Sequence, residues 1–357
     1  MTDTLLTLTD TDVEDLLETL VSTTSFTQYE HHAVRYLVDW MVEHGYDEAF
    51  VDDAGNAVGI IGSGQHDVVL LGHIDTFPGE LPVQREGRLL YGRGSVDAKG
   101  PLATFVAAGV QATLPDNIRL IVIGAVEEEG SSKGARFVAE QYRPAACIIG
   151  EPSHWDRITL GYKGRLLLDW HWQGPLAHSA GTALSAGERA VAYWQRAIDY
   201  ANDFNADKEA IFSRLDATLQ AINTRENGAY GEASLTAGFR LPPTITPAEI
   251  EAALQPDDGA AVSARGHELA YVSERDTALS RAFRGAIRSQ GGTPRFVHKT
   301  GTSDMNVVGP VWNCPIVAYG PGDSALDHTP EEHIDLDEYL RAIDVLTSAL
   351  GKLNFRS

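Results

Sequence analysis

Hydrophobic and polar positions along the chain follow two different periods, which together predict an α/β layer architecture. Apolar runs of strand length occur at 57–61, 68–71, 120–125, 145–149 and 315–319. Helical patterns, in which apolar residues recur three and four positions apart, occupy 11–45 with a break at 22–25, 101–114, 132–141 and 336–350. Because the apolar strands alternate with helices, we expect strands and helices to form separate packed layers.

The pattern changes near residue 160, where a second kind of fold begins. Leu166, Leu168, Trp170 and Trp172 recur with a period of two, which is typical of one buried face of a strand. A helical pattern at 186–202, further strand-like segments and a short helix at 247–254 follow. We therefore expect a small α+β domain at 160–276, inserted between two parts of the first domain at 1–159 and 277–357.

The charge balance excludes some classes of partner. The 357 residues include 50 Asp and Glu but only 28 Lys and Arg, which gives a net charge of -22. Such a surface repels nucleic-acid phosphates. No apolar run reaches the ~20 residues of a membrane span, and the acidic N-terminus favours a cytoplasmic protein. Only six of the basic residues are lysines, so we expect adaptation to high salt, with an ordinary acidic enzyme as the alternative.

Histidine and acidic side chains follow apolar runs in five separate segments. These are Gly72–Asp75, Gly92–Gly100, Ala125–Gly130, Ile148–Pro152 and Leu326–Pro330. His73 and Asp75 point to the same side if the strand continues, and a carboxylate so placed can orient a metal-bound histidine. Each segment alone is also typical of a solvated loop or a structural histidine.

Taken together, the five segments indicate a hydrolytic metal centre. Sites in open α/β sheets form outside the carboxyl ends of the strands, where we place three of the segments. Their acids would repel one another unless one or two divalent cations lay between them. The rival pattern is Gly130–Gly134, which matches the G-x-S-x-G nucleophile turn of serine hydrolases. The carboxylates directly before it disfavour a developing oxyanion, so the metal centre is the better hypothesis.

The five segments, in this order, resemble the dinuclear-zinc superfamily of ArgE, DapE, aminoacylases and carboxypeptidase G over essentially the whole chain. The resemblance implies a zinc-peptidase-like catalytic domain with a mixed central sheet flanked by helices, and an inserted ferredoxin-like lid domain. It also implies two divalent metal ions, Zn²⁺ or Co²⁺, which activate a water molecule for attack on an amide. A homodimer formed through the lid domain is a further implication.

The same resemblance assigns roles to individual side chains. The ligands of the first metal ion would be His73 and Glu151, and those of the second Glu128 and His328, with Asp97 bridging both. Asp75 would orient His73, and Glu127 would be the general base. Because Glu129 is also acidic, an assignment of the general base and the acidic ligand of the second metal ion shifted by one residue, to Glu128 and Glu129, remains open. The Asp97–Ala98 peptide bond is expected to be cis, and His178, in the lid segment, would stabilise the oxyanion.

Three further segments resemble the LysK subfamily more narrowly. They are Gly161–Gly164, Lys299–Asn306, and Tyr319–Asp323 leading into His328–His333. That subfamily releases lysine or ornithine from the C-terminal glutamate of a small acidic amino-group carrier protein. The substrate contacts would be made by Lys163, Arg240, Lys299, Gly301, Thr302 and Ser303.

Two other functions remain open from the sequence. One is an N-acetylornithine or N-acetyllysine deacetylase or a related dipeptidase, which would use the same metal centre. The other is a non-catalytic binding protein on the same fold. The filled ligand positions and the presence of Glu127 argue against this second alternative.

Overall fold

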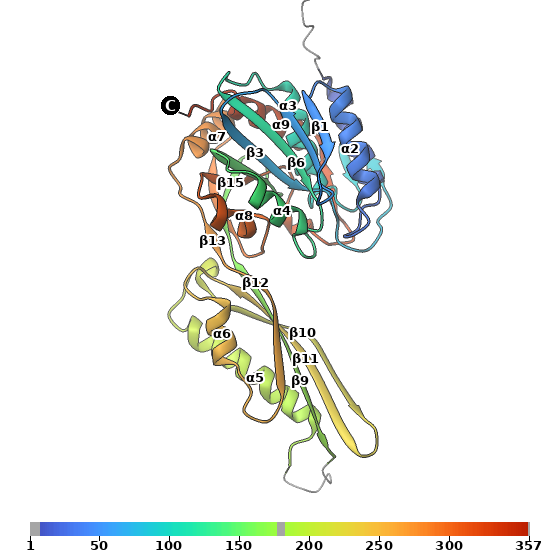
Figure 1. Cartoon of the computed structure of the whole chain (residues 1–357), viewed down its shortest axis with the longest axis vertical. Coiled ribbons are helices and arrows are strands. Elements are labelled where there is room, and N and C mark those ends of the chain that lie inside the picture. Colours follow the sequence, from blue (N-terminus) through green and yellow to red (C-terminus); the bar gives the residue numbers. More distant parts are fainter. Residues whose placement is uncertain (1–7, 177–182, 356–357) are drawn as a thin grey trace, which may run out of the picture. The chain divides into compact units, whose positions relative to one another are not determined.

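The computed structural model describes residues 8–176 and 183–355, which form two compact units. The first unit comprises residues 1–161, 273–297 and 303–357, and the second comprises 162–272 and 298–302. The short segment 298–302 therefore belongs to the second unit, whereas the sequence places it in the returning part of the first domain. Figure 1 shows the elements of both units.

A mixed sheet forms the centre of the first unit. In the described residues it has nine strands, in the order β1-β2-β6-β3-β7-β15-β8-β13, with β14 paired to β8. Strands β6, β3, β7 and β15 run parallel, whereas β1 and β2 are antiparallel. The bounds are β1 Glu48–Val51, β2 Ala57–Ile61, β3 His66–His73, β6 Ile118–Ala125, β7 Ala146–Gly150, β8 Arg157–Tyr162, β13 Tyr271–Val272, β14 Arg295–Lys299 and β15 Ile316–Tyr319.

The parallel strands are mostly apolar and buried because helices cover both faces of the sheet (Figure 1). Val68, Leu70 and Leu71 of β3 are fully buried, as are Leu120 and Ile121 of β6. The helices are α1 Asp10–Ser22, α2 His31–Glu43, α3 Lys99–Gln111, α4 Lys133–Gln141, α7 Ala278–Ser289, α8 Met305–Trp312 and α9 Leu336–Leu350. The expected mixed sheet flanked by helices is confirmed.

A separate antiparallel sheet of three short strands also belongs to the described residues. It has the order β16-β5-β4, with bounds His333–Asp335, Leu89–Tyr91 and Gln84–Glu86. Because His333 of β16 pairs with Tyr91 of β5, the segment that follows β5 begins next to the point where the segment before β16 ends. These two segments carry Asp97 and His328.

The second unit is a four-stranded antiparallel sheet covered by helices. Its strand order is β10-β11-β9-β12, with bounds β9 Gly164–Pro175, β10 Asp216–Glu226, β11 Tyr230–Leu241 and β12 Ala261–Glu268. Helices α5 (Ala186–Asn205) and α6 (Pro247–Ala253) pack against it. Leu166, Leu168 and Trp170 point into its core, as the period of two predicts. Among the described helices, none has the combination of length and apolar character that a membrane crossing requires.

Candidate metal centre

The carboxyl ends of three neighbouring strands bring the first site residues together. Strand β3 ends at His73, β7 ends immediately before Glu151, and β6 ends at Ala125, paired with His73. Gly72 pairs with Gly150, so His73 and Glu151 leave adjacent parallel strands at the same level. Only 2% of His73 and 9% of Glu151 are exposed. The first site residues therefore lie at the ends of the buried central strands.

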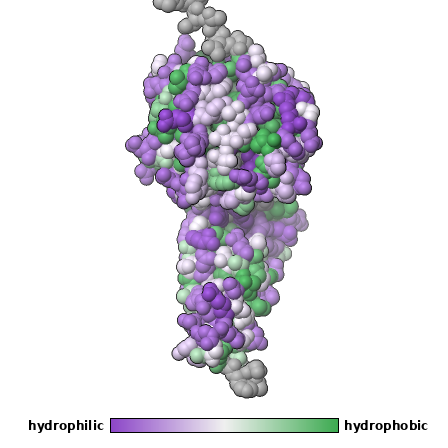
Figure 2. Space-filling view, turned by 90° about the vertical axis from the view of Figure 1, so that its right-hand side faces the viewer, coloured by the Kyte–Doolittle hydropathy of each residue, from purple (hydrophilic) through white to green (hydrophobic). Residues whose placement is uncertain are grey.

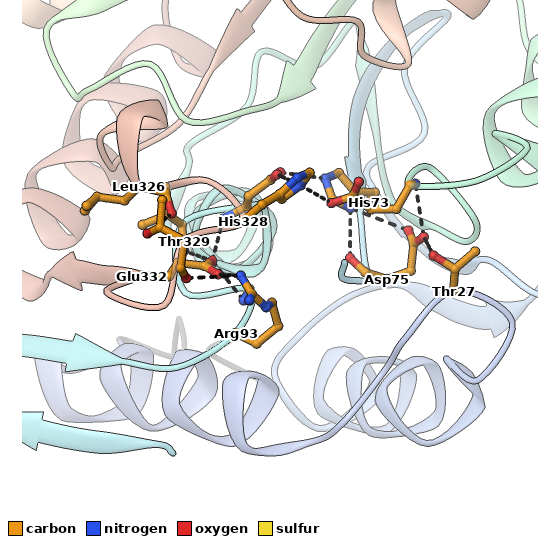
Figure 3. Close-up of polar contacts among 12 residues, drawn as sticks. Thr27, His73, Asp75, Arg93, Leu326, His328, Thr329 and Glu332 are labelled. Atoms are coloured by element: carbon orange, nitrogen blue, oxygen red, sulfur yellow. Dashed lines mark hydrogen bonds and ion pairs between the residues drawn. The ribbon is translucent and has the colours of Figure 1, made fainter. Parts of the chain in front are cut away.

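Two groups of side chains in the described residues have the geometry to hold a metal ion. The buried group consists of His73, Asp97 and Glu151, and the outer group consists of Asp97, Glu129 and His328. In each group the ligand atoms lie within 4.8 Å of one another. Asp97 belongs to both: its Oδ1 lies 3.2 Å from His73 Nε2 and its Oδ2 lies 3.0 Å from His328 Nε2. Figure 3 shows the side chains of His73 and His328 pointing toward each other.

The acidic segment after β6 does not have the register expected from the sequence. Glu129 Oε1 lies 2.8 Å from His328 Nε2, whereas Glu128 belongs to neither group. Glu127 turns away from both: its Oε2 accepts a hydrogen bond from Ser131 Oγ at 2.7 Å. The reason is local, because β6 ends at Ala125 and Glu127 has a left-handed φ of 61°. The alternation of a strand no longer applies there, and Glu129 takes the position that we expected for Glu128.

Glu128 is instead a half-buried carboxylate whose charge interacts with residues of both groups. Burial raises its pKa well above the usual range, and the nearby charges of Asp304, Glu151 and Glu129 raise it further, against the opposing effect of His73. Burial likewise raises the pKa of Glu151 well above its usual value. It raises the pKa of Asp304, which precedes α8, to about 7. Asp304 was not among the predicted site residues; its position directly before a helix, in Thr302–Asn306, is the signal that marks it.

This concentration of acids and imidazoles fits a bound metal ion. Burial opposes a positive charge on His73, yet hydrogen bonds to Asp75 and Asp97 raise its pKa well above 6.5. Hydrogen bonds to Asp97 and Glu129 raise the pKa of His328 to about 10. The carboxylates around both rings therefore stabilise positive charge at this place. A divalent cation would supply that charge and relieve the repulsion among the carboxylates. Imidazole nitrogens and carboxylate oxygens are ligands that Zn²⁺ and related ions accept.

Asp75 fixes the acidic segment as well as His73. Its Oδ1 and Oδ2 accept hydrogen bonds from the backbone N–H groups of Glu128 and Glu129 at 3.0 and 3.1 Å. Thr27 Oγ1 donates to Oδ2 at 2.9 Å, a contact visible in Figure 3. His73 Nδ1 lies 3.0 Å from the carbonyl oxygen of Asp75 and 3.5 Å from its carboxylate. One buried side chain therefore orients the strand-end ligand and the loop that carries the outer ligand.

Two other expectations at this centre have different outcomes. The peptide bond between Asp97 and Ala98 is cis, as we predicted. His178 lies outside the described residues, so its role as an oxyanion stabiliser stays a prediction.

The expected substrate contacts already have partners within the chain. Lys163 is fully buried, and its Nζ donates to the Arg214 carbonyl oxygen and to Asp216 Oδ2, both at 2.6 Å. The N–H of Lys163 donates to the carbonyl oxygen of Lys299 at 3.2 Å. These contacts hold the Lys163 ammonium group against Asp216, and its role in substrate binding stays a prediction.

The segment around Gly301 is similarly engaged. Arg240 Nη1 donates to Thr302 Oγ1 at 3.0 Å, and the N–H of Ser303 donates to Asn306 Oδ1 at 2.9 Å. The Ser303 N–H therefore already has a partner within the chain. The roles of Arg240, Lys299, Gly301, Thr302 and Ser303 in substrate binding stay predictions.

Comparison with protein families identifies relatives over nearly the full length. Residues 69–352 match the model of peptidase family M20/M25/M40. The LysW-lysine hydrolase of Deinococcus radiodurans is 49% identical over 350 residues, which cover 95% of this chain and 96% of that protein. The LysW-lysine/LysW-ornithine hydrolase of Sulfurisphaera tokodaii is 31% identical over 293 residues, which cover 81% of this chain and 82% of the relative.

Comparison with solved structures supports the fold. The crystal structure of a tripeptidase from Staphylococcus aureus superposes with a TM-score of 0.78 and 14% sequence identity, and covers 96% of this chain and 98% of the tripeptidase. At this level of identity the match concerns the fold alone.

Proposed function

The chain belongs to peptidase family M20/M25/M40, and from this premise we propose that it releases lysine, ornithine or both from the C-terminal glutamate of a small carrier protein. The bond cleaved is an amide between a glutamate carboxyl group and the amine of the released amino acid. The observation that carries the proposal is the pair of ligand groups joined by Asp97, with the half-buried Glu128 in the loop that carries Glu129. The names of the two relatives supply the class of substrate.

Each ligand group would hold one divalent ion. We assign His73, Asp97 and Glu151 to one ion and Asp97, Glu129 and His328 to the other. When bound, two such ions lower the pKa of a water molecule and polarise an amide carbonyl. Zinc is our proposal for the ion, with cobalt as an alternative that the same ligands accept.

Glu128 replaces Glu127 as the proposed general base. Its half-buried side chain interacts electrostatically with His73 and Glu129, and Asp75 holds its backbone N–H. A carboxylate whose pKa is raised can take a proton from the attacking water and return it to the leaving amine. Glu127 instead begins the turn into α4, since its carbonyl oxygen accepts from Gly130 and Ser132 at 3.2 and 2.6 Å.

A simple deacetylase acting on N-acetylornithine or N-acetyllysine is the second candidate. Both substrates would use the same centre, so kinetics must separate them. We expect kcat/KM for the carrier-linked amino acid to exceed that for the acetylated one at least ~10²-fold, because only the carrier offers remote binding energy. Assays of carrier-linked lysine, carrier-linked ornithine and both acetylated amino acids, side by side, test this. Equal efficiencies would assign the chain to the deacetylases.

Lys299 is the side chain by which we propose to probe carrier recognition. Lys299→Ala should lower kcat/KM for the carrier-linked substrate far more than for the acetylated amino acid, as the resemblance of residues 299–306 implies. Lys352→Ala, at the end of the chain after α9, is the matched control and should leave both unchanged. A uniform loss on both substrates for Lys299→Ala would remove it from carrier recognition.

We also propose that the chain forms a homodimer through the second unit. Strand β10 is an edge strand, and edge strands are surfaces that a second chain can pair with. A groove of about 580 Å³ lies between α5 and β10, lined by Val191 and Ile222 among others. Val191 and Ile222 are 58% and 43% exposed, and Figure 2 shows apolar surface on the viewed face of this unit. Light scattering should give twice the chain mass, and Val191→Asp with Ile222→Asp should give a monomer.

A further inference from the structure

Two loops that carry ligands of the outer group are linked by a residue that is not itself a ligand. Residues 92–98 follow β5 and carry Asp97, and residues 326–332 precede β16 and carry His328. The pairing of β16 with β5 brings the bases of these loops together. Glu332 occupies the last position before β16, and its side chain is completely buried.

The Glu332 carboxylate binds the backbone of the Asp97 loop at three places. Its Oε1 accepts hydrogen bonds from the N–H groups of Gly94, Val96 and Asp97 at 2.9, 3.1 and 3.2 Å. The carbonyl oxygen of Glu332 accepts a further bond from the Gly92 N–H at 3.2 Å. Bonds to an ionised acceptor are stronger than neutral ones, so this carboxylate determines the path of the loop up to Asp97 itself.

Arg93 extends the same connection to a third loop. Its Nη1 lies 2.7 Å from Glu332 Oε2, and its Nε donates to the carbonyl oxygen of Gly79 at 3.1 Å. Gly79 belongs to the loop that follows His73 and Asp75. A longer contact of 3.5 Å joins Arg93 Nη1 to the carbonyl oxygen of Thr329, next to His328 (Figure 3). The ion pair thus connects all three loops around the outer group.

We propose that Glu332, with Arg93, is a positioning residue that holds Asp97 and His328 at the spacing needed for the outer metal ion. The inference rests on the proposed two-metal function. It is selective because Glu332 and Arg93 contact the loops that carry Asp97 and His328, and the outer group takes both of these ligands whereas the buried group takes only Asp97. Loss of the carboxylate should therefore weaken the outer ion more than the buried one.

Glu332→Gln tests this with little change in shape. The amide oxygen can still accept from the backbone N–H groups, but the amide nitrogen then faces the Arg93 guanidinium, and two donors oppose each other. The matched control is Glu14→Gln, which removes another largely buried carboxylate of the same unit. Glu14 accepts from Arg85 and Arg88 at 2.6 and 2.7 Å, and neither arginine lies in a ligand loop. Arg93→Gln is a second variant, which removes the ion pair but leaves the three backbone bonds.

The measurement is titration of the metal-free proteins with Co²⁺, followed by calorimetry and by the visible absorption of the bound ion. Wild type and Glu14→Gln should take up two ions. In Glu332→Gln the affinity for the outer ion should fall roughly 10- to 100-fold, as for other residues that orient metal ligands. The affinity for the buried ion should fall less. Arg93→Gln should show a smaller loss of the same kind, and it decides the question if Glu332→Gln does not fold.

The outcomes distinguish the proposed two-metal function from the positioning role of Glu332. A wild-type protein that binds fewer than two ions contradicts the proposed function and this inference with it. A wild type that binds two ions, with both affinities unchanged in the variants, contradicts the inference alone. Equal loss of both affinities would also overturn it, since it would give the ion pair a general structural role.

Discussion

The two ligand groups of the metal centre are built in different ways. The buried group takes His73 and Glu151 from the ends of adjacent parallel strands, and these side chains are 2% and 9% exposed. The outer group takes Glu129 and His328 from loops, and the His328 side chain is 40% exposed. The His328 ring stacks on Phe77 with ring centres 4.3 Å apart. Strand pairing positions the first group, whereas buried carboxylates and one aromatic ring position the second.

This difference shows what a loop needs in order to hold a ligand. Pairing of β3 with its neighbours fixes the backbone at His73 and Glu151, and Asp75 orients the His73 ring. The acidic loop instead depends on Asp75, and the Asp97 loop depends on Glu332, each of which accepts several backbone N–H groups. Unpaired buried N–H groups are costly, so each carboxylate both satisfies a loop and fixes its ligand.

The largest effect should come from Glu128→Gln, with Glu127→Gln as the comparison. Glu128→Gln should lower kcat by about 10²- to 10⁴-fold, the scale of a positioned proton transfer. Glu127→Gln should keep most of the activity because its side chain points toward Ser131. Steady-state rates at saturating substrate, with metal content measured in parallel, check this. A large loss in Glu127→Gln alone would restore the register expected from the sequence.

Much of this centre could be predicted from the sequence, and the part that could not has a physical cause. His73 and Glu151 follow apolar runs, so the pattern of strands gives their place directly. Glu129 could not be chosen over Glu128, because the strand period ends at Ala125 and the left-handed turn at Glu127 depends on contacts made after folding. Glu332 gave no periodic signal either, since its role is fixed only when β16 pairs with β5.

In the inserted domain, too, the strand pattern could be predicted from the sequence, whereas a contact between distant residues could not. The period of two in Leu166, Leu168 and Trp170 correctly predicts a buried strand face. The sequence suggested that Lys163 contacts substrate, but its ammonium group is buried against Asp216. An isolated lysine in a loop-like segment carries no information about its partner when that partner is more than fifty positions away.

Removing the shared ligand should cost more metal than removing an outer one. Asp97→Ala should lose both ions, because Asp97 belongs to both groups, whereas His328→Ala should lose one. Elemental analysis after dialysis in metal-free buffer measures the ions per chain. Equal retention in the two variants would show that Asp97 does not bridge the groups.

Chelation should distinguish the groups in the wild-type protein. The outer group is more exposed, so a chelator should remove about one ion per chain in a fast phase and the other in a slower phase. Metal release followed over time, with Phe77→Ala as a variant, checks this. Loss of the stacked ring should speed the fast phase only. A single phase for both ions would contradict the difference between the two groups.

Salt should produce the smallest effect, because it screens exposed charges and leaves buried ones largely unaffected. The net charge of -22 predicts self-repulsion in dilute buffer. The Tm should therefore rise as KCl approaches molar concentration, while the metal content of the buried group stays constant. Differential scanning calorimetry across this range measures the first quantity. A flat or falling Tm would contradict the salt adaptation.

The most direct test of the two-group account is the metal content of Glu129→Gln and Glu128→Gln, measured side by side. Both substitutions are in the same loop and change the same atoms, so only the position differs. We predict about one ion per chain in Glu129→Gln, because Glu129 completes the outer group, and two ions per chain in inactive Glu128→Gln. Two ions in Glu129→Gln and one in Glu128→Gln would contradict the account.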